Sequence, residues 1–375
     1  MSREVLKLTA LLGERDRSDD GRLLVDDLLD LLGRHKVAGS VLLRGIEGFG
    51  LRRRLATERL LTLSEDLPLM AVATDEPERI GALLGEADAL MAHGLLTLER
   101  ARAIGPGETI AAGGRAQGRP APGAGVRLTC HVGRGDRIGG APAHRHLVDH
   151  MRDAGMDAGV TLLGVDGTRG GVRIRARFFA ANAEVPLVIS AVGDPAAADR
   201  AVTALHAAVR PGLLTAERVT ICVRAGAAVA PLPPADPPPG AGAGPAGAGP
   251  AGAGSDVWQK ITVHLADRER HAGPGAYVDL LRALREAGAA GATVLRGVWG
   301  FQGSGPPHGD RPLAVPRRAP LICVAIDRPA AVARWFEVVQ AATRAAEGLA
   351  FAEQVPALRA RAPGHVEGAL RLARS

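Results

Sequence analysis

Two short phrases combine arginine and glycine in a way that suits anion binding: RGIEGFG at residues 44–50 and RGVWGFQG at residues 296–303. Glycine lets backbone N–H groups approach a phosphate or carboxylate closely, and arginine adds a charge-assisted hydrogen bond. The candidate ligand-binding residues are Arg44, Gly45, Gly48, Phe49 and Gly50 in the first phrase and Arg296, Gly297, Gly300, Phe301 and Gln302 in the second. The alternative is that the glycines only permit a tight bend, with each arginine on a solvated edge.

Other charged segments offer weaker candidates. GERDR (13–17), GRGDR (133–137) and ADRER (266–270) could hold an anion or pair across a domain boundary, or could be solvated turns with local salt bridges. VRIRARF (172–178) and the arginines at 52–54 could dock on an acidic partner protein, a membrane transporter or anionic lipid. Nucleic acid is disfavoured as a partner because it usually needs stacking aromatics, and only Phe178 and Phe179 lie nearby.

The sequence contains few residues in patterns typical of metal binding or catalysis. His146 and His150 have the i, i+4 spacing of a helical metal pair, but no third ligand accompanies them and the other copies of the repeat described below lack the pair. We expect a surface histidine cluster and no metal. The sequence shows no matched acid, base and nucleophile, so we expect no catalytic residue and no enzyme.

Four phrases recur three times in the same order, which indicates three diverged copies of one domain. KLTALLGERDR begins at Lys7, RLTCHVGRGDR at Arg127 and KITVHLADRER at Lys260. Proline pairs frame an apolar run in each copy, and a GLLT-type turn follows at Gly94, Gly212 or Gly348. Copy two departs from the others because LLGVDGTRGG (162–171) replaces the Arg-Gly-Phe phrase, so at most two of three sites match.

Two Gly/Pro-rich stretches separate the copies, since neither can bury enough apolar surface to offset its ordering entropy. The predicted organisation is repeat one at 1–104, a linker at 105–125, the diverged repeat two at 126–225, a linker at 226–255, repeat three at 256–360 and a C-terminal tail at 361–375.

The composition is that of an ordinary folded protein, with 46% hydrophobic and 23% charged residues. No apolar run approaches the ~20 residues of a membrane-spanning helix, and the N-terminus does not resemble a secretory signal. Three cysteines in apolar runs, Cys130, Cys222 and Cys323, indicate buried thiols in a reducing compartment. We therefore expect a cytoplasmic protein. The net charge of +6 favours anionic partners only weakly.

Hydrophobic periodicity predicts the order strand-helix-strand-strand-helix-strand in each copy. Residues 4–12 alternate as a half-buried strand, and Leu24, Leu28, Leu31 and Leu32 recur at helical spacing. This order predicts an α+β fold of three tandem ferredoxin-like domains, each a four-stranded sheet with two helices on one face. The bare face of each sheet must be covered, so we expect one chain to close as a pseudo-trimer. The alternative is three beads that associate between chains.

The phrases GERDR, DLPL and AGATVLRGVWGF resemble the family called domain of unknown function 190, which is similar to the PII nitrogen-regulatory proteins. The resemblance covers all three copies and is weakest in copy two. It implies trimers that bind small anionic effectors, typically adenine nucleotides, in clefts between protomers, with a mobile loop between strands two and three that signals to a partner. By resemblance, Gly50 and Gln302 match the base of that loop. The glycine-rich nucleotide clamp of PII proteins is absent.

The leading hypothesis is a PII-like regulatory protein that binds a small anion or nucleotide between domains. The alternatives are a constitutive interaction scaffold without a small ligand and an enzyme with its site at a cleft between domains.

Overall fold

The computed structural model describes residues 3–50, 56–57, 66–110, 121–176, 182–208, 213–234, 257–266, 275–309, 319–362 and 364–372. Several sequence predictions fall outside these ranges. They concern the arginines at 52–54, Arg177 and Phe178 of the basic arm, residues 267–270, residues 111–120 of the first predicted linker and residues 235–255 of the second.

The described residues of copy one form two helices and six strands. They are β1 (Arg3–Gly13), α1 (Leu24–Arg34), β2 (Gly39–Arg44), β3 (Glu47–Phe49), β4 (Ala56–Thr57), β5 (Pro68–Asp75), α2 (Pro77–Leu90) and β6 (Gly94–Ala103). The apolar stripe predicted for the first helix is buried, since Leu24, Leu28, Leu31 and Leu32 are each at most 1% exposed.

Copies two and three repeat this order with small additions. Copy two has β7 (Ala124–Gly133), β8 (Arg137–Ile138), β9 (Ala141–Pro142), α3 (Ala143–Asp153), β10 (Ala158–Arg169), β11 (Val172–Arg173), β12 (Pro186–Gly193), α4 (Pro195–Ala208), β13 (Leu214–Arg224) and β14 (Ala227–Ala228). Copy three has β15 (Trp258–Ala266), α5 (Ala276–Glu286), β16 (Ala292–Gln302), β17 (His308–Gly309), β18 (Pro320–Asp327), α6 (Pro329–Ala346), β19 (Leu349–Val355), β20 (Ala357–Ala362) and β21 (His365–Ala369).

The proline pairs set element boundaries in all three copies. The first proline begins a strand, where its missing N–H costs least, and the second begins a helix. The pairs are Pro68 and Pro77, Pro186 and Pro195, and Pro320 and Pro329.

The predicted fold class is wrong, because the strands of the three copies join into one antiparallel sheet. The local order in copy one is β6-β1-β5-β2, but these strands also pair with other copies. A closed ring of ten strands runs through β1, β5, β2, β10, β16, β18, β15, β19, β13 and β6. The protein is therefore mostly β, and its copies are not three separate ferredoxin-like α+β domains.

Long strands cause this closure. The 12-residue β10 pairs with β12 of its own copy and also with β16 of copy three and β2 of copy one. A strand that outruns its own sheet exposes unpaired N–H and C=O groups, and pairing with the next copy satisfies them. The segment predicted as a C-terminal tail contributes β21, which pairs with β20, and β20 in turn pairs with β6.

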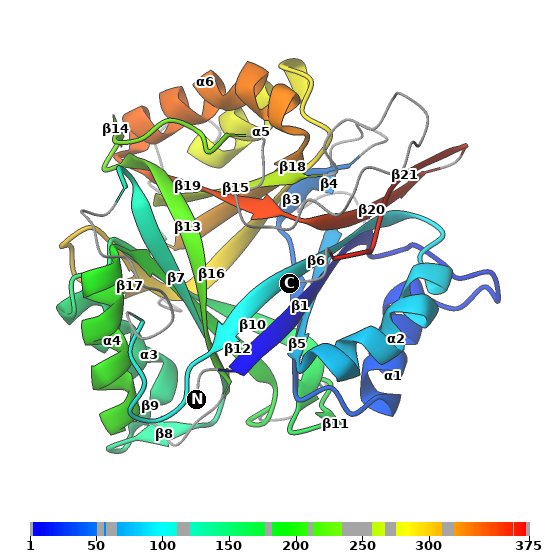
Figure 1. Ribbon diagram of the computed structural model, residues 1–375, viewed down its shortest axis with the longest axis horizontal. Coiled ribbons are helices and arrows are strands. Elements are labelled where there is room, and N and C mark those ends of the chain that lie inside the picture. Colours follow the sequence, from blue (N-terminus) through cyan, green and yellow to red (C-terminus); the bar gives the residue numbers. More distant parts are fainter. Residues whose placement is uncertain are drawn as a thin grey trace, which may run out of the picture.

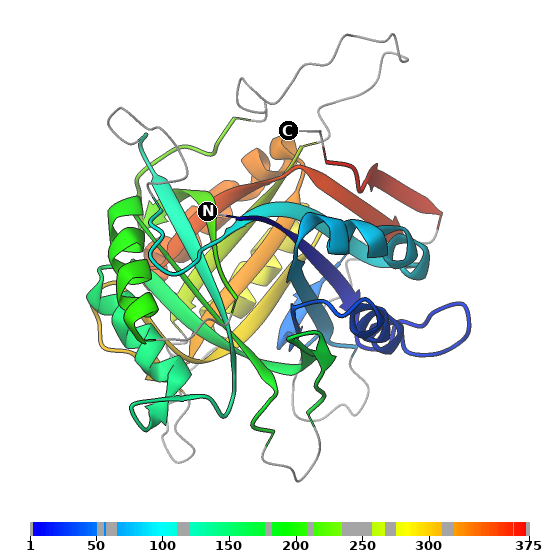
Figure 2. The ribbon, with the colours of Figure 1, turned by 60° about the horizontal axis from the view of Figure 1, so that its bottom comes forward.

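The helix pairs lie at three corners of the molecule, with the strands between them (Figure 1). Each pair covers a separate apolar core, and Figure 2 shows the same helices on the outside from a second direction. A further core lies on the inner side of the sheet and draws Val41, Val160 and Leu295 from the three copies. The inner sheet faces are thus buried against one another.

All three cysteines are free and buried, which confirms the buried thiols expected from the sequence. Burial raises the pKa of each thiol to about 12. Among the described helices, none has the length and apolar character needed to cross a membrane.

Candidate functional site

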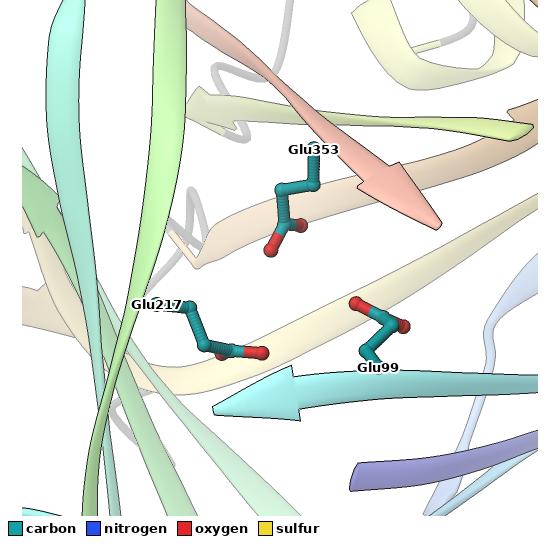
Figure 3. Close-up of side chains that lie close together, drawn as sticks. All are labelled: Glu99, Glu217 and Glu353. Carbon is teal, nitrogen blue, oxygen red and sulfur yellow. The ribbon is translucent and has the colours of Figure 1, made fainter. Parts of the chain in front are cut away.

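Six charged side chains, one cation and one carboxylate from each copy, meet at the centre of the molecule. The cations are Lys7, Arg127 and Lys260, and the carboxylates are Glu99, Glu217 and Glu353. The cations lie on the first strand of each copy and the carboxylates on the strand that follows its second helix. Figure 3 shows the three carboxylates pointing toward a common point. We call these six residues the central charge ring.

Each lysine of the ring contacts two carboxylates. The Nζ of Lys7 lies 3.1 Å from Glu99 Oε2 and also bonds Glu217. The Nζ of Lys260 lies 3.2 Å from Glu353 Oε2 and also bonds Glu99. Lys7 and Lys260 therefore share Glu99 between them.

Arg127 closes the ring because it contacts both Glu217 and Glu353, each of which has only one lysine neighbour in the ring. Its Nε donates to Glu217 Oε2 at 2.9 Å, and its Nη1 donates to Glu353 Oε2 at 3.0 Å. Cations and carboxylates thus alternate around the ring, and every charge has two opposite neighbours.

Burial alone disfavours the charged form of a carboxyl group, but neighbouring cations keep Glu99 and Glu217 ionised. Burial raises the pKa of Glu99, yet Lys260, Lys7 and Arg127 together lower it well below its ordinary value. The same competition, led by Arg127, lowers the pKa of Glu217 to about 2. Burial and Arg127 push the pKa of Lys7 down, but the three carboxylates outweigh them and raise it. The pKa of Lys260 moves down because burial prevails there.

The three carboxylates lie close enough to suggest a metal site, since one oxygen from each falls within 4.8 Å of the others. Two protein cations already contact each carboxylate, however, and the three positive charges balance the three negative ones. The arrangement is therefore that of a buried ion-pair network, and a metal ion would have to displace these cations.

A cavity of about 90 Å³ lies beside the ring. Its lining includes the three ring cations but none of the ring carboxylates. Threonines from equivalent strand positions, Thr9, Thr129 and Thr262, also line it. His131 and His264 line it as well, and Leu11 takes the corresponding place in copy one. Burial lowers the pKa of both histidines to about 4, so both are neutral at pH 7.

The Arg-Gly-Phe phrases lie where a strand of one copy pairs with a strand of another. We use the word seam for each of three such pairings, β3 with β16, β16 with β10, and β10 with β2. In the seam between copies one and three, β3 pairs with β16, and Phe49 lies opposite Ala292. Phe49 is 5% exposed and packs in the core of copy three. Carbon atoms added at Gly45 and Gly48 would each lie 2.7 Å from a neighbouring atom, so these glycines permit close strand packing.

The second phrase forms the same contact with copy two. β16 pairs with β10, and Phe301 lies opposite Gly159. Phe301 is 2% exposed and packs in the core of copy two. Gly297 and Gly300 lie tightly against Val160 and the backbone of Gly159, respectively.

Copy two keeps the seam despite its divergent phrase. Its β10 pairs with β2, and Thr168 takes the place of the phenylalanine, opposite Ser40. The backbone N–H and the hydroxyl of Thr168 both donate to Ser40 Oγ at 2.9 Å. Arg173 of the basic arm adds ion pairs to Asp26 and Asp30 on α1 of copy one.

The remaining predicted ligand residues lie on or next to the strands that form the seams. Arg44 is exposed and its Nη2 donates to Glu14 Oε2 at 2.9 Å, whereas Arg296 is half-buried on β16. A carbon atom added at Gly50 would meet no atom within 4 Å, and Gln302 Nε2 donates to the carbonyl of Glu347. The structure thus places the first phrase between copies one and three and the second between copies three and two. The role of these residues in ligand binding stays a prediction.

Other sequence candidates have local partners. Asp16 and Asp136 accept from the backbone N–H of Gly13 and Gly133, at 2.7 and 2.9 Å, and so fix the turns after the first strands. His146 and His150 lie on α3 with their Nε2 atoms 2.8 Å apart. No group of three metal-ligating side chains includes them among the residues that the structure describes.

The family model of domain of unknown function 190, described as an uncharacterized ACR, matches residues 5–103, 125–221 and 258–357. These three matches cover most of the chain, so the protein belongs to this family and contains three tandem copies of its domain. The sequence prediction of three copies is confirmed.

Sequence reasoning missed the central charge ring. The signal lies in the aligned copies, because Lys7, Arg127 and Lys260 begin the same recurring phrase, two residues before its threonine. The glutamates recur in the same way on the strands that follow the second helices, β6, β13 and β19. A charge that recurs at the same position of a half-buried strand in every copy indicates a shared structural role.

Proposed function

We propose that this protein is a regulatory small-molecule-binding protein that takes a small anionic effector at the seams between its copies. An adenine nucleotide is one candidate for this effector. Loops between the second and third strands of each copy would pass occupancy to a partner protein. The observation that supports this most is the shared position of Arg44 and Arg296, each at the point where a strand leaves its own sheet and enters a seam.

The chemistry of Arg44 suits an exchangeable anion contact. Its side chain is 45% exposed and, within the described part of the chain, pairs with Glu14 alone, whose side chain is 37% exposed. Such a surface pair contributes about 0–1 kcal/mol, so an incoming phosphate or carboxylate can replace the glutamate at little cost. Copy two has Leu163 at this position, which predicts two effector sites per chain instead of three.

A scaffold without a small ligand is the second candidate, and one observation favours it. The seam glycines are already explained by close strand packing: a carbon atom added at Gly300 would lie 2.3 Å from the carbonyl oxygen of Gly159. In this case the seams serve only to hold the copies together, and the loops bind a partner constitutively.

Thermal-shift measurements separate the two candidates. The full chain is screened with ATP, ADP, AMP, a cyclic dinucleotide, bicarbonate and fluoride. A ligand at 100 times its Kd should add about 2.7 kcal/mol to the free energy of unfolding. We expect Arg44→Ala and Arg296→Ala to reduce this shift and Arg34→Ala, on the outer face of α1, to leave it unchanged. No shift with any of these compounds would favour the scaffold.

A further inference from the structure

The cavity beside the central charge ring presents a positive surface. Lys7, Arg127 and Lys260 line it, whereas their carboxylate partners do not, and no aspartate or glutamate is among its described lining residues. The ring is neutral as a whole, but its cations are nearer to the cavity than its carboxylates. An anion in the cavity would therefore be closer to the three positive charges than to the three negative ones, which favours its binding.

Hydroxyl groups from the first strand of each of the three copies line the cavity. Thr9, Thr129 and Thr262 lie two residues beyond the ring cations on β1, β7 and β15, and so share their strand face. Thr9 and Thr262 are 7% and 4% exposed. Within the described ranges, none of the three hydroxyls hydrogen bonds to another protein group. Thr129 is half-buried. A hydroxyl that faces a cavity without a protein partner loses hydrogen bonds, so each is available to donate to an occupant of the cavity.

Two neutral histidines add to this set. His264 is 5% exposed and its ring nitrogens have no hydrogen-bond partner in the described part of the chain. The Nδ1 of His131 is likewise buried and unpartnered there. A neutral imidazole can donate one hydrogen bond without adding a charge. Three further hydroxyl-bearing residues, Thr74, Ser190 and Thr215, also line the cavity, and the rest of the lining is mostly apolar.

We propose that this cavity binds a small inorganic oxyanion, held by the hydroxyls of Thr9, Thr129 and Thr262 on the cationic side of the ring. About 90 Å³ is several times the space that one water needs, which suits an ion of the size of phosphate with accompanying water. The site belongs to all three copies at once, unlike a seam site, which belongs to two. The inference is independent of the effector proposed for the seams.

Calorimetric titration of the full chain tests the proposal with inorganic phosphate, sulfate and nitrate, at constant ionic strength in a chloride buffer. We expect saturable binding of at least one ion. Thr262→Val, which removes the hydroxyl at nearly constant volume, should weaken this binding at least tenfold, and the triple threonine-to-valine variant should abolish it. Thr203→Val, whose hydroxyl lies outside the cavity and bonds the carbonyl of Asp199, is the matched control.

A second measurement keeps the proposal testable where a cavity variant fails to fold. Crystals of the unaltered protein soaked in selenate should show an anomalous peak inside the cavity, between the three threonines. Peaks confined to the surface, water alone in the cavity, or binding that the triple variant leaves unchanged would overturn the proposal. Arg44→Ala should not affect this site, so its failure and the failure of the seam proposal are distinguishable.

Discussion

The ring of Phe301 in copy three lies directly against Gly159 of copy two, where a β-carbon would be 2.4 Å from the ring carbon Cε1. Real β-carbons essentially never approach so closely, so this contact requires glycine. The pair joins β16 to β10 and places an aromatic side chain from one copy in the core of the next.

In the other two seams, the equivalent position carries a side chain whose size matches the residue opposite it. Phe49 lies opposite Ala292, and the smaller Thr168 lies opposite Ser40, which it hydrogen bonds. The larger side chain thus faces glycine or alanine, and the polar one faces a polar partner. This matching favours one cyclic arrangement of the copies over others.

We predict that Gly159→Ala destabilises the protein by about 1–3 kcal/mol, the usual cost of overpacking a filled core. Gly50→Ala is the control, because a β-carbon at Gly50 meets no atom within 4 Å. Chemical denaturation of both variants measures the effect. Equal stability of the two variants would show that the Phe301 contact is not formed as described.

The central charge ring should be sensitive to the loss of a single charge. Glu217→Gln leaves Lys7 and Arg127 each with one carboxylate fewer in a buried setting, and breaking such a pair typically costs about 3–5 kcal/mol. Glu4→Gln removes a charge whose side chain is 50% exposed and lies 3.5 Å from Arg100, and it should change stability by about 0.5 kcal/mol or less. The free energy of unfolding from urea titration compares them. A loss below about 1 kcal/mol for Glu217→Gln would contradict a tightly coupled ring.

Stability should fall as the pH drops from about 6.5 toward 4. The pKa of both His131 and His264 is lowered by burial to about 4, whereas unfolded histidine titrates near its ordinary 6.5. Between these values the unfolded state binds more protons, so acid favours unfolding, by up to roughly 3 kcal/mol for each histidine. The effect fades above about pH 6.5. The pKa of Glu99 and of Glu217 is lowered in the folded protein by the ring cations, so these two carboxylates add to the loss of stability as the pH nears and falls below the ordinary 4.5.

Leucine substitutions identify the source of this pH dependence. Copy one carries Leu11 at the equivalent position, so His131→Leu and His264→Leu introduce a residue that the fold already accepts there. Unfolding measured at pH 7.5, 6, 5 and 4.5 should show a flatter profile for each variant and the flattest for the double variant. An unchanged slope in the double variant would assign the pH dependence to other groups.

The sequence predicts the parts that depend on local patterns. The three copies, the apolar stripe from Leu24 to Leu32 and the proline-led elements all follow from spacing and composition. The pairing of strands from different copies into one closed sheet could not be predicted, because pairing between segments more than 100 residues apart leaves no local signal in the sequence. Lys7 and Glu217 lie 210 residues apart in the chain and yet hydrogen bond. Likewise, the glycines of the Arg-Gly-Phe phrases suit both an anion and a tightly packed seam, and sequence alone does not separate these uses.

The central claim is that the three copies fold as one body around a shared charge ring, and differential scanning calorimetry of the full chain tests it most directly. We predict a single transition whose calorimetric and van't Hoff enthalpies agree, because no copy can leave the closed sheet without exposing its neighbours' strand edges and unpairing the ring. Two or three separate transitions, each with the enthalpy of about 100 residues, would contradict it.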